Sequence, residues 1–227
     1  MIPPPENPLV VAIDVSDLGR AESLARAVGP AAGMVKVGLE LFSAHGPASV
    51  ARIRKIAPVF LDLKLHDIPT TVERAARNAA RLGVAMLTVH ALGGEAMVAA
   101  AVRGVRQGSE ETGHPPPGVL AVTVLSSLSG ESLASPASLA FEAKAAGAAG
   151  TVVSGEDVAV VREVTGEEFC LVVPGIRPAG SNGHDQLRVL TPEEALDAGA
   201  DYLVIGRPIT GSIDPAATAK SILATIR

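Results

Sequence analysis

The stretch Val59-Phe-Leu-Asp-Leu-Lys-Leu-His-Asp-Ile-Pro-Thr-Thr71 passes from an apolar, strand-like run into a helix-like segment. Residues 59–64 are predicted as a strand and residues 70–82 as a helix. Side chains alternate faces along a strand, so Asp62 and Lys64 share one face and the leucines take the other. An ion pair in a buried strand is costly unless its charges satisfy each other. The pair is therefore either a structural bridge or a catalytic site in which carboxylates hold and aim one lysine.

The same strand–helix unit recurs along the whole chain. The predicted strands are residues 9–14, 34–37, 59–64, 86–90, 120–125, 151–154, 169–173 and 202–206, and the helix-like segments include 70–82, 95–107, 136–146 and 191–198. Eight such units, spaced by about 20 to 35 residues, predict an α/β fold of the (β/α)8 TIM-barrel type. A doubly wound open sheet is the alternative, but no Gly-rich dinucleotide fingerprint follows the first strand.

Helix boundaries carry local signals. Thr191-Pro-Glu-Glu194 offers an N-cap, a proline at the first helical position and a glutamate that can complete a capping box. Gly83, Gly147 and Gly199 stand where helices should stop.

Bulk composition excludes several classes of protein. The 227 residues fit one catalytic domain, 1–227, with residues 1–8 as a flexible lead-in, and no apolar run reaches membrane-spanning length. The net charge of −5 and the absence of a basic patch with aromatics argue against nucleic acid as a partner. The single cysteine, Cys170, lies in a predicted strand and is expected to be a small core residue. Because the first residues lack a targeting signal, we expect a cytoplasmic protein without membrane contact.

Polar residues collect at the C-terminal ends of the predicted strands, where barrels of this kind place their active sites. They are Asp14, Lys36, Asp62, Lys64, His90, Ser126, Arg177, Gln186, Gly206 and Arg207. A ring of polar groups on otherwise apolar strands is hard to explain by stability. It indicates a pocket for a charged, hydroxyl-bearing ligand.

Two features of this ring have a specific chemical use. Gly206 lets backbone N–H groups approach a phosphate, and Arg207 supplies a planar bidentate donor, although an arginine there can also be a solvated surface residue. Arg177 and Gln186 are placed in the preceding loop to close over the same anion.

Lys36 and Lys64 on adjacent strands should repel each other unless the carboxylates of Asp62 and Asp67 alternate with them. Such an array is fixed before a ligand arrives and can stabilise a developing anion.

In these residues the sequence closely resembles the orotidine 5'-phosphate decarboxylases, and the resemblance covers essentially the whole chain. The matching stretches are Val11-Ala-Ile-Asp14, Val35-Lys-Val-Gly-Leu-Glu-Leu-Phe42, Phe60 to Thr71, Thr88-Val-His-Ala91, Ala121-Val-Thr-Val-Leu-Ser126, Val173-Pro-Gly-Ile-Arg177, Asp185-Gln-Leu-Arg188 and Ile205-Gly-Arg-Pro-Ile-Thr210. The resemblance implies decarboxylation of orotidine 5'-monophosphate to uridine 5'-monophosphate, the last step of de novo pyrimidine nucleotide biosynthesis. It implies no metal and no organic cofactor.

The resemblance also implies roles for individual residues. Lys64 would protonate C6 after carbon dioxide leaves, with Asp62 and Lys36 completing the charged network. Lys36 and Asp14 would contact the ribose hydroxyls. Asp67 would join the catalytic set, and Ile68 and Thr71 the substrate-binding set. The segment carrying Asp67 and Thr71 reaches into the partner subunit's site in this family, which makes the active unit a homodimer.

The remaining implied contacts concern the two ends of the nucleotide. Ser126 would bind the pyrimidine edge, although bacterial relatives often have threonine there. The phosphate would be held by Arg177, Gln186, Gly206 and Arg207.

Two other functions compete with this one. The first is a magnesium-dependent sugar-phosphate decarboxylase or aldolase of the same suprafamily, in which a glutamate stands near the position of Lys36. A lysine there would oppose a divalent cation. The second is a non-catalytic phosphate-binding barrel, which has no need of four alternating charges.

Overall fold

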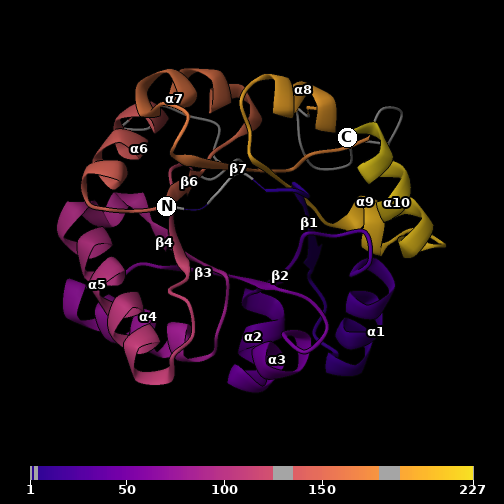
Figure 1. Cartoon of the computed structure of the whole chain (residues 1–227), viewed down its shortest axis with the longest axis horizontal. Coiled ribbons are helices and arrows are strands. Elements are labelled where there is room, and N and C mark those ends of the chain that lie inside the picture. Colours follow the sequence, from indigo (N-terminus) through magenta and orange to yellow (C-terminus); the bar gives the residue numbers. More distant parts are fainter. Residues whose placement is uncertain (1, 3–4, 125–134, 179–189, 227) are drawn as a thin grey trace.

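A computed structural model describes residue 2 and residues 5–124, 135–178 and 190–226. Within these residues, eight parallel strands form one closed barrel in the order β1 to β8, with helices around it (Figure 1). The strands are β1 (Leu9–Ile13), β2 (Met34–Gly38), β3 (Val59–Leu65), β4 (Met86–His90), β5 (Gly118–Val122), β6 (Gly150–Val152), β7 (Cys170–Pro174) and β8 (Tyr202–Ile205). The predicted TIM barrel is confirmed, and the open sheet is wrong because β1 pairs with β8.

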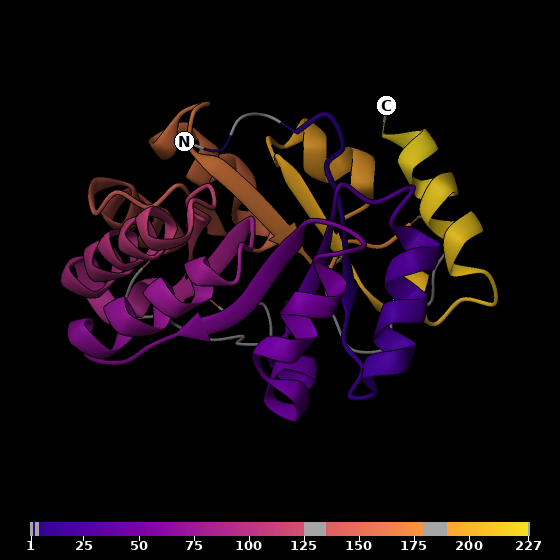
Figure 2. The ribbon, with the colours of Figure 1, turned by 60° about the horizontal axis from the view of Figure 1, so that its bottom comes forward.

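The helical layer follows the expected β–α alternation. Its helices are α1 (Leu18–Val28), α2 (Leu39–His45), α3 (Pro47–Ile53), α4 (Pro69–Arg81), α5 (Gly94–Thr112), α6 (Pro136–Ala145), α7 (Val158–Thr165), α8 (Pro192–Asp197), α9 (Arg207–Thr210) and α10 (Pro215–Thr225), with short 3₁₀ turns η1 (Ala91–Gly93) and η2 (Gly155–Asp157). Figure 2 shows from another side how these helices run along the outside of the strands. No helix among the described residues is long and apolar enough to cross a membrane.

The helix boundary signals predicted from the sequence are confirmed. Thr191 and Glu194 form a reciprocal capping box at the start of α8. Gly83, Gly147 and Gly199 follow the last residues of α4, α6 and α8 with φ of 68°, 88° and 104°. Because a side chain is strained in this left-handed region, glycine is the residue that ends these helices most readily.

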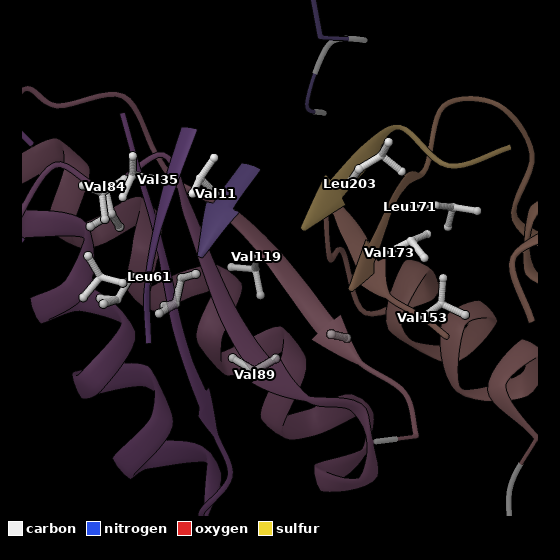
Figure 3. Close-up of a cluster of buried hydrophobic side chains, with 14 of the residues drawn as sticks. Val11, Val35, Leu61, Val84, Val89, Val119, Val153, Leu171, Val173 and Leu203 are labelled. Atoms are coloured by element: carbon white, nitrogen blue, oxygen red, sulfur yellow. The ribbon is translucent and has the colours of Figure 1, made fainter. Parts of the chain in front are cut away.

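Alternation along the strands produces two separate apolar layers. One layer fills the barrel interior and is made of Val10, Ala12, Met34, Phe60, Met86, Leu120, Cys170, Val172, Tyr202 and Val204. The other lies between barrel and helices, and Figure 3 shows members such as Leu61 and Val89 on strands that run beside helices. Cys170 is 4% exposed, as its predicted core position requires, and burial raises the pKa of its thiol.

The N-terminal ends of β7 and β8 are tied to α7 by one arginine. Arg162 donates hydrogen bonds to the carbonyl oxygens of Gly166, Phe169 and Gly199, and to Asp201 Oδ2 at 2.8 Å. The same carboxylate oxygen accepts a 2.7 Å hydrogen bond from the backbone N–H of Leu171. The Arg162 side chain is only 11% exposed, so solvent cannot replace these bonds if the side chain is removed.

We expect Arg162→Ala to lower the free energy of unfolding by about 3 kcal/mol or more, since it leaves the half-buried Asp201 carboxylate without its charge partner. Urea unfolding at matched protein concentration measures this change. The matched control is Arg52→Ala, because Arg52 pairs with Glu22 but is 53% exposed. Exposed pairs contribute about 0 to 1 kcal/mol. Equal shifts in the two variants would contradict a structural role for Arg162 beyond that of a surface pair.

Candidate active site

The C-terminal ends of β1, β2 and β3 bring four of the predicted charged residues together. Lys36 Nζ lies 3.0 Å from Asp14 Oδ1 and 3.6 Å from Asp62 Oδ2. Lys64 Nζ donates to both carboxylate oxygens of Asp62, at 2.9 and 2.8 Å. The four side chains therefore form a continuous chain of opposite charges in the order Asp14, Lys36, Asp62, Lys64.

Strand pairing explains why these side chains meet. Lys36 stands opposite Phe60, and Gly38 stands opposite Asp62, in the parallel pairing of β2 with β3. Lys36 and Asp62 therefore project into the barrel on the same face as Phe60, which lies in the interior layer. Asp14 follows directly after β1 and is more exposed than the others.

Burial and charge act in opposite directions on Asp62. Burial by itself would raise the pKa of this carboxyl, but the charges of Lys36 and Lys64 and hydrogen bonds from Lys64 and Thr88 lower it. The net pKa lies below the ordinary value, so the carboxylate is held ionised between two cations.

A cavity of about 160 Å³ adjoins the charged residues inside the barrel mouth. Lys36, Asp62 and Lys64 line one side of it together with Phe60. The rest of its wall is mainly apolar and comes from Val122, Val124, Val152, Val153, Ser154, Pro174 and Val204. This combination can accept a flat, weakly polar ring whose reactive atom faces fixed charges.

Thr88 and Gly38 also belong to this arrangement, although the sequence alone predicts no role for either. The Thr88 hydroxyl lies 2.9 Å from Asp62 Oδ1 and 2.8 Å from the backbone nitrogen of Lys64. A Cβ added to Gly38 would lie 2.8 Å from Asp14 Oδ1 and 3.1 Å from Lys36 Nζ. The alternation of Lys36 with Gly38, and of Met86 with Thr88, is the signal in the sequence that places them on the inward face.

Asp67, Ile68 and Thr71 lie outside this charged chain. They are exposed at and after the end of β3, and Asp67 Oδ1 accepts a 2.6 Å hydrogen bond from the backbone N–H of Ile68. Among the described residues, the Asp67 carboxylate makes no ion pair with Lys64 or Lys36. The expected alternation of four charges thus ends at Lys64 within one chain.

His90 lies beside the charged residues at the end of β4. Its ring stacks on that of His66, with centroids 5.2 Å apart and an angle of 22° between the planes. Its Nδ1 accepts a 3.4 Å hydrogen bond from the backbone N–H of Leu92. Burial, His66 and Lys64 lower the pKa of His90, which favours a neutral ring next to the lysine.

Only some of the predicted phosphate-binding residues lie among the described residues. Gly206 follows β8 directly and lies close to Asp14, since a Cβ added to Gly206 would be 4.0 Å from Asp14 Oδ2. Arg207 begins α9 and is exposed, and Arg177 lies just after β7. Ser126 and Gln186 lie outside the described residues.

Known proteins of one family match this chain over almost its whole length. The orotidine 5'-phosphate decarboxylase / HUMPS family matches residues 7–222. Proteins named orotidine 5'-phosphate decarboxylase from Anaeromyxobacter sp. (strain K) and Moorella thermoacetica are 51% and 48% identical, over 97% of this chain and 98% and 92% of their own lengths.

A solved structure gives the same result. The crystal structure of orotidine 5'-phosphate decarboxylase from Lactobacillus acidophilus has a TM-score of 0.85 and 36% identity, and the match covers 98% of this chain and 100% of that one. Sequence and structure therefore agree on one family. The chain belongs to the orotidine 5'-phosphate decarboxylase / HUMPS family.

Proposed function

We propose that this protein is an orotidine 5'-phosphate decarboxylase that converts orotidine 5'-monophosphate to uridine 5'-monophosphate without a cofactor, in de novo pyrimidine nucleotide biosynthesis. The names of relatives that are about half identical over nearly the full length support this activity. The observation that carries the proposal in the structure is the Lys36–Asp62–Lys64 array facing a largely apolar cavity. In this proposal residues 1–227 act as one catalytic domain.

The proposed chemistry places Lys64 at the reacting carbon. The bond between C6 and the carboxylate breaks, carbon dioxide leaves, and the electron pair stays on C6. The Lys64 ammonium stabilises this negative charge and then transfers a proton to C6, after which the amine regains a proton from water. Asp62 holds the ammonium through two hydrogen bonds, which orients it before the substrate arrives.

The other ends of the nucleotide would meet the remaining predicted residues. Asp14 and Lys36, paired at 3.0 Å, are suited to the ribose hydroxyls because they offer both an acceptor and a donor. Arg177, Gln186, Gly206 and Arg207 would bind the phosphate, and Ser126 the pyrimidine edge. Binding energy from the remote phosphate can then orient the reacting carbon.

The magnesium-dependent alternative is disfavoured by the position of Lys36. Its ammonium lies between Asp14 and Asp62, the carboxylates that a divalent cation would otherwise share. A second cation at that point would be repelled. The partner that this proposal includes is a small nucleotide substrate. It includes neither nucleic acid nor a membrane. The cytoplasmic location expected from the sequence stays a prediction.

The proposal includes a homodimer in which each subunit completes the other's site. Ile68 is 66% exposed, and Leu39 and Leu92, each 53% exposed, follow the neighbouring strands β2 and β4. Large apolar side chains gathered at one rim are typical of a protein–protein interface. Asp67 lies beside Ile68 and points no carboxylate at its own lysines, which suits a residue that acts across that interface.

Turnover of orotidine 5'-monophosphate, followed by loss of the orotate absorbance, tests the activity, and EDTA should leave the rate unchanged. Lys64→Ala should lower kcat by at least about 100-fold, since it removes the proposed general acid. Lys55→Ala is the matched control, because Lys55 is an exposed lysine that precedes β3 at the opposite end of the barrel. A Lys64→Ala variant with more than about a tenth of wild-type turnover would rule out the proton-donor role.

Gly38→Ala should lower kcat/KM by about 10- to 100-fold, because its methyl group would displace Asp14 and Lys36 from their pairing. Gly38 has a φ of −96°, so alanine adds no backbone strain and the effect isolates the steric contact. Gly19→Ala is the control, since its Cβ would meet only an ordinary 3.4 Å contact. Unchanged kinetics for Gly38→Ala would show that the Asp14–Lys36 pair tolerates displacement.

Asp67→Asn and Lys64→Ala should each be inactive alone and should regain activity when mixed under conditions of subunit exchange. In a mixed dimer one site lacks both groups and the other is complete, provided that Asp67 acts across the interface. Random pairing gives about a quarter of wild-type activity, because half of the dimers are mixed and half of their sites are intact. Native mass spectrometry verifies the exchange. No recovery in exchanged dimers would assign Asp67 to its own subunit's site.

A further inference from the structure

The Thr88 hydroxyl makes two hydrogen bonds with the residues that carry the proposed chemistry. It donates to Asp62 Oδ1 at 2.9 Å and accepts from the backbone N–H of Lys64 at 2.8 Å. Thr88 is fully buried in β4, so water cannot substitute for either bond. A hydroxyl is suited to this place because one oxygen both donates and accepts.

The strand geometry shows why Lys64 needs a partner from a side chain. In the pairing of β3 with β4, Leu61 stands opposite Leu87 and Leu65 opposite Val89. Three residues of β3 (Asp62, Leu63 and Lys64) therefore face the single residue Thr88, which is a bulge in the sheet. A bulge leaves some backbone groups without a backbone hydrogen-bond partner on the neighbouring strand. At this point Thr88 Oγ1 accepts a hydrogen bond from the backbone N–H of Lys64.

Lys64 itself has an unusual backbone. Its φ is 49°, and among the described residues it is the only non-glycine with a positive φ. A non-glycine residue keeps this strained left-handed backbone conformation only where contacts with the surrounding structure fix it. Lys64 is held at the backbone by Thr88 and at the ammonium by Asp62.

We propose that Thr88 is a positioning residue for the decarboxylation, which fixes both the backbone of Lys64 and the orientation of the Asp62 carboxylate through one hydroxyl group. With Thr88 in place, Asp62 Oδ1 accepts from Thr88 and Lys64, while Oδ2 accepts from Lys64 and faces Lys36. Rotation of the carboxylate would break bonds on both oxygens. The proton donor and its carboxylate partner are thereby held in one arrangement.

The test replaces Thr88 with valine, which has the same shape and no hydroxyl, and with serine, which keeps the hydroxyl. We expect Thr88→Val to lower kcat by about 10- to 100-fold, the effect of losing hydrogen bonds to a charged group, with KM within about threefold. Thr88→Ser should keep kcat within about threefold of wild type. The acid limb of the pH–kcat profile should move to higher pH in Thr88→Val, because loss of a donor raises the pKa of Asp62.

Thr151→Val is the matched control. Thr151 is also a fully buried strand threonine, and its hydroxyl donates a 2.6 Å hydrogen bond to the carbonyl oxygen of Ala121, away from the charged residues. Circular dichroism verifies that all variants are folded. If Thr88→Val does not fold, Thr88→Ala removes the same two bonds from a smaller side chain and takes its place in every measurement.

The inference rests on the proposed decarboxylase function, so a second readout is independent of turnover. The carboxyl carbon of Asp62, labelled with ¹³C, reports the pKa of this group by NMR in the free protein. That pKa should rise in Thr88→Val and stay unchanged in Thr88→Ser and Thr151→Val. If the wild type does not turn over orotidine 5'-monophosphate, the proposed function fails, and the titration alone decides on Thr88.

Three results would overturn the role of Thr88. They are an unchanged Asp62 pKa in Thr88→Val, equal losses of kcat in Thr88→Val and Thr88→Ser, and equal losses of kcat in Thr88→Val and Thr151→Val. The first shows that the hydroxyl does not act on the carboxylate, the second that the hydroxyl is not the group that matters, and the third that the loss reflects buried packing in general.

Discussion

The carboxylate of Asp62 is the group on which the rest of the site depends. It accepts two hydrogen bonds from Lys64 and lies 3.6 Å from the ammonium of Lys36. Two like charges about 4 Å apart repel by roughly 4 kcal/mol at an effective dielectric of 20. Because Asp62 lies between the two lysines, both cations can face one small cavity. Without it, repulsion between the two ammonium groups would oppose this arrangement.

The barrel is what makes such an arrangement possible at a fixed geometry. Lys36 and Asp62 come from neighbouring strands, and their positions follow from the register that sets Gly38 opposite Asp62. A slip of one residue would move Lys36 to the helix-facing side of the sheet. The apolar layers on both sides of the strands hold that register, so the stability of the core and the geometry of the charges are linked.

The sequence was sufficient for the barrel and for the charged residues on β1 to β3, but not for features that depend on contacts between strands. Strand β6 begins at Gly150, one residue before its predicted start, because glycine lets this strand approach Cys170 of β7 where a Cβ would collide. Thr88 and Gly38 were missed for the same reason: their roles follow from which atoms the register places opposite them. Ser126 and Gln186 lie outside the described residues and stay predictions.

Alternation on one strand explains why Asp62 and Lys64 share a face, but not how closely they pair. Along a regular strand, residues two apart are separated by about 6.6 Å. The bulge at Thr88 and the left-handed backbone of Lys64 alter that geometry, and the ammonium reaches both carboxylate oxygens. A non-glycine residue in this conformation costs about 1 to 2 kcal/mol. That strain is stored at the residue proposed to donate the proton, where a lysine held at both ends needs little reorganisation as charge develops.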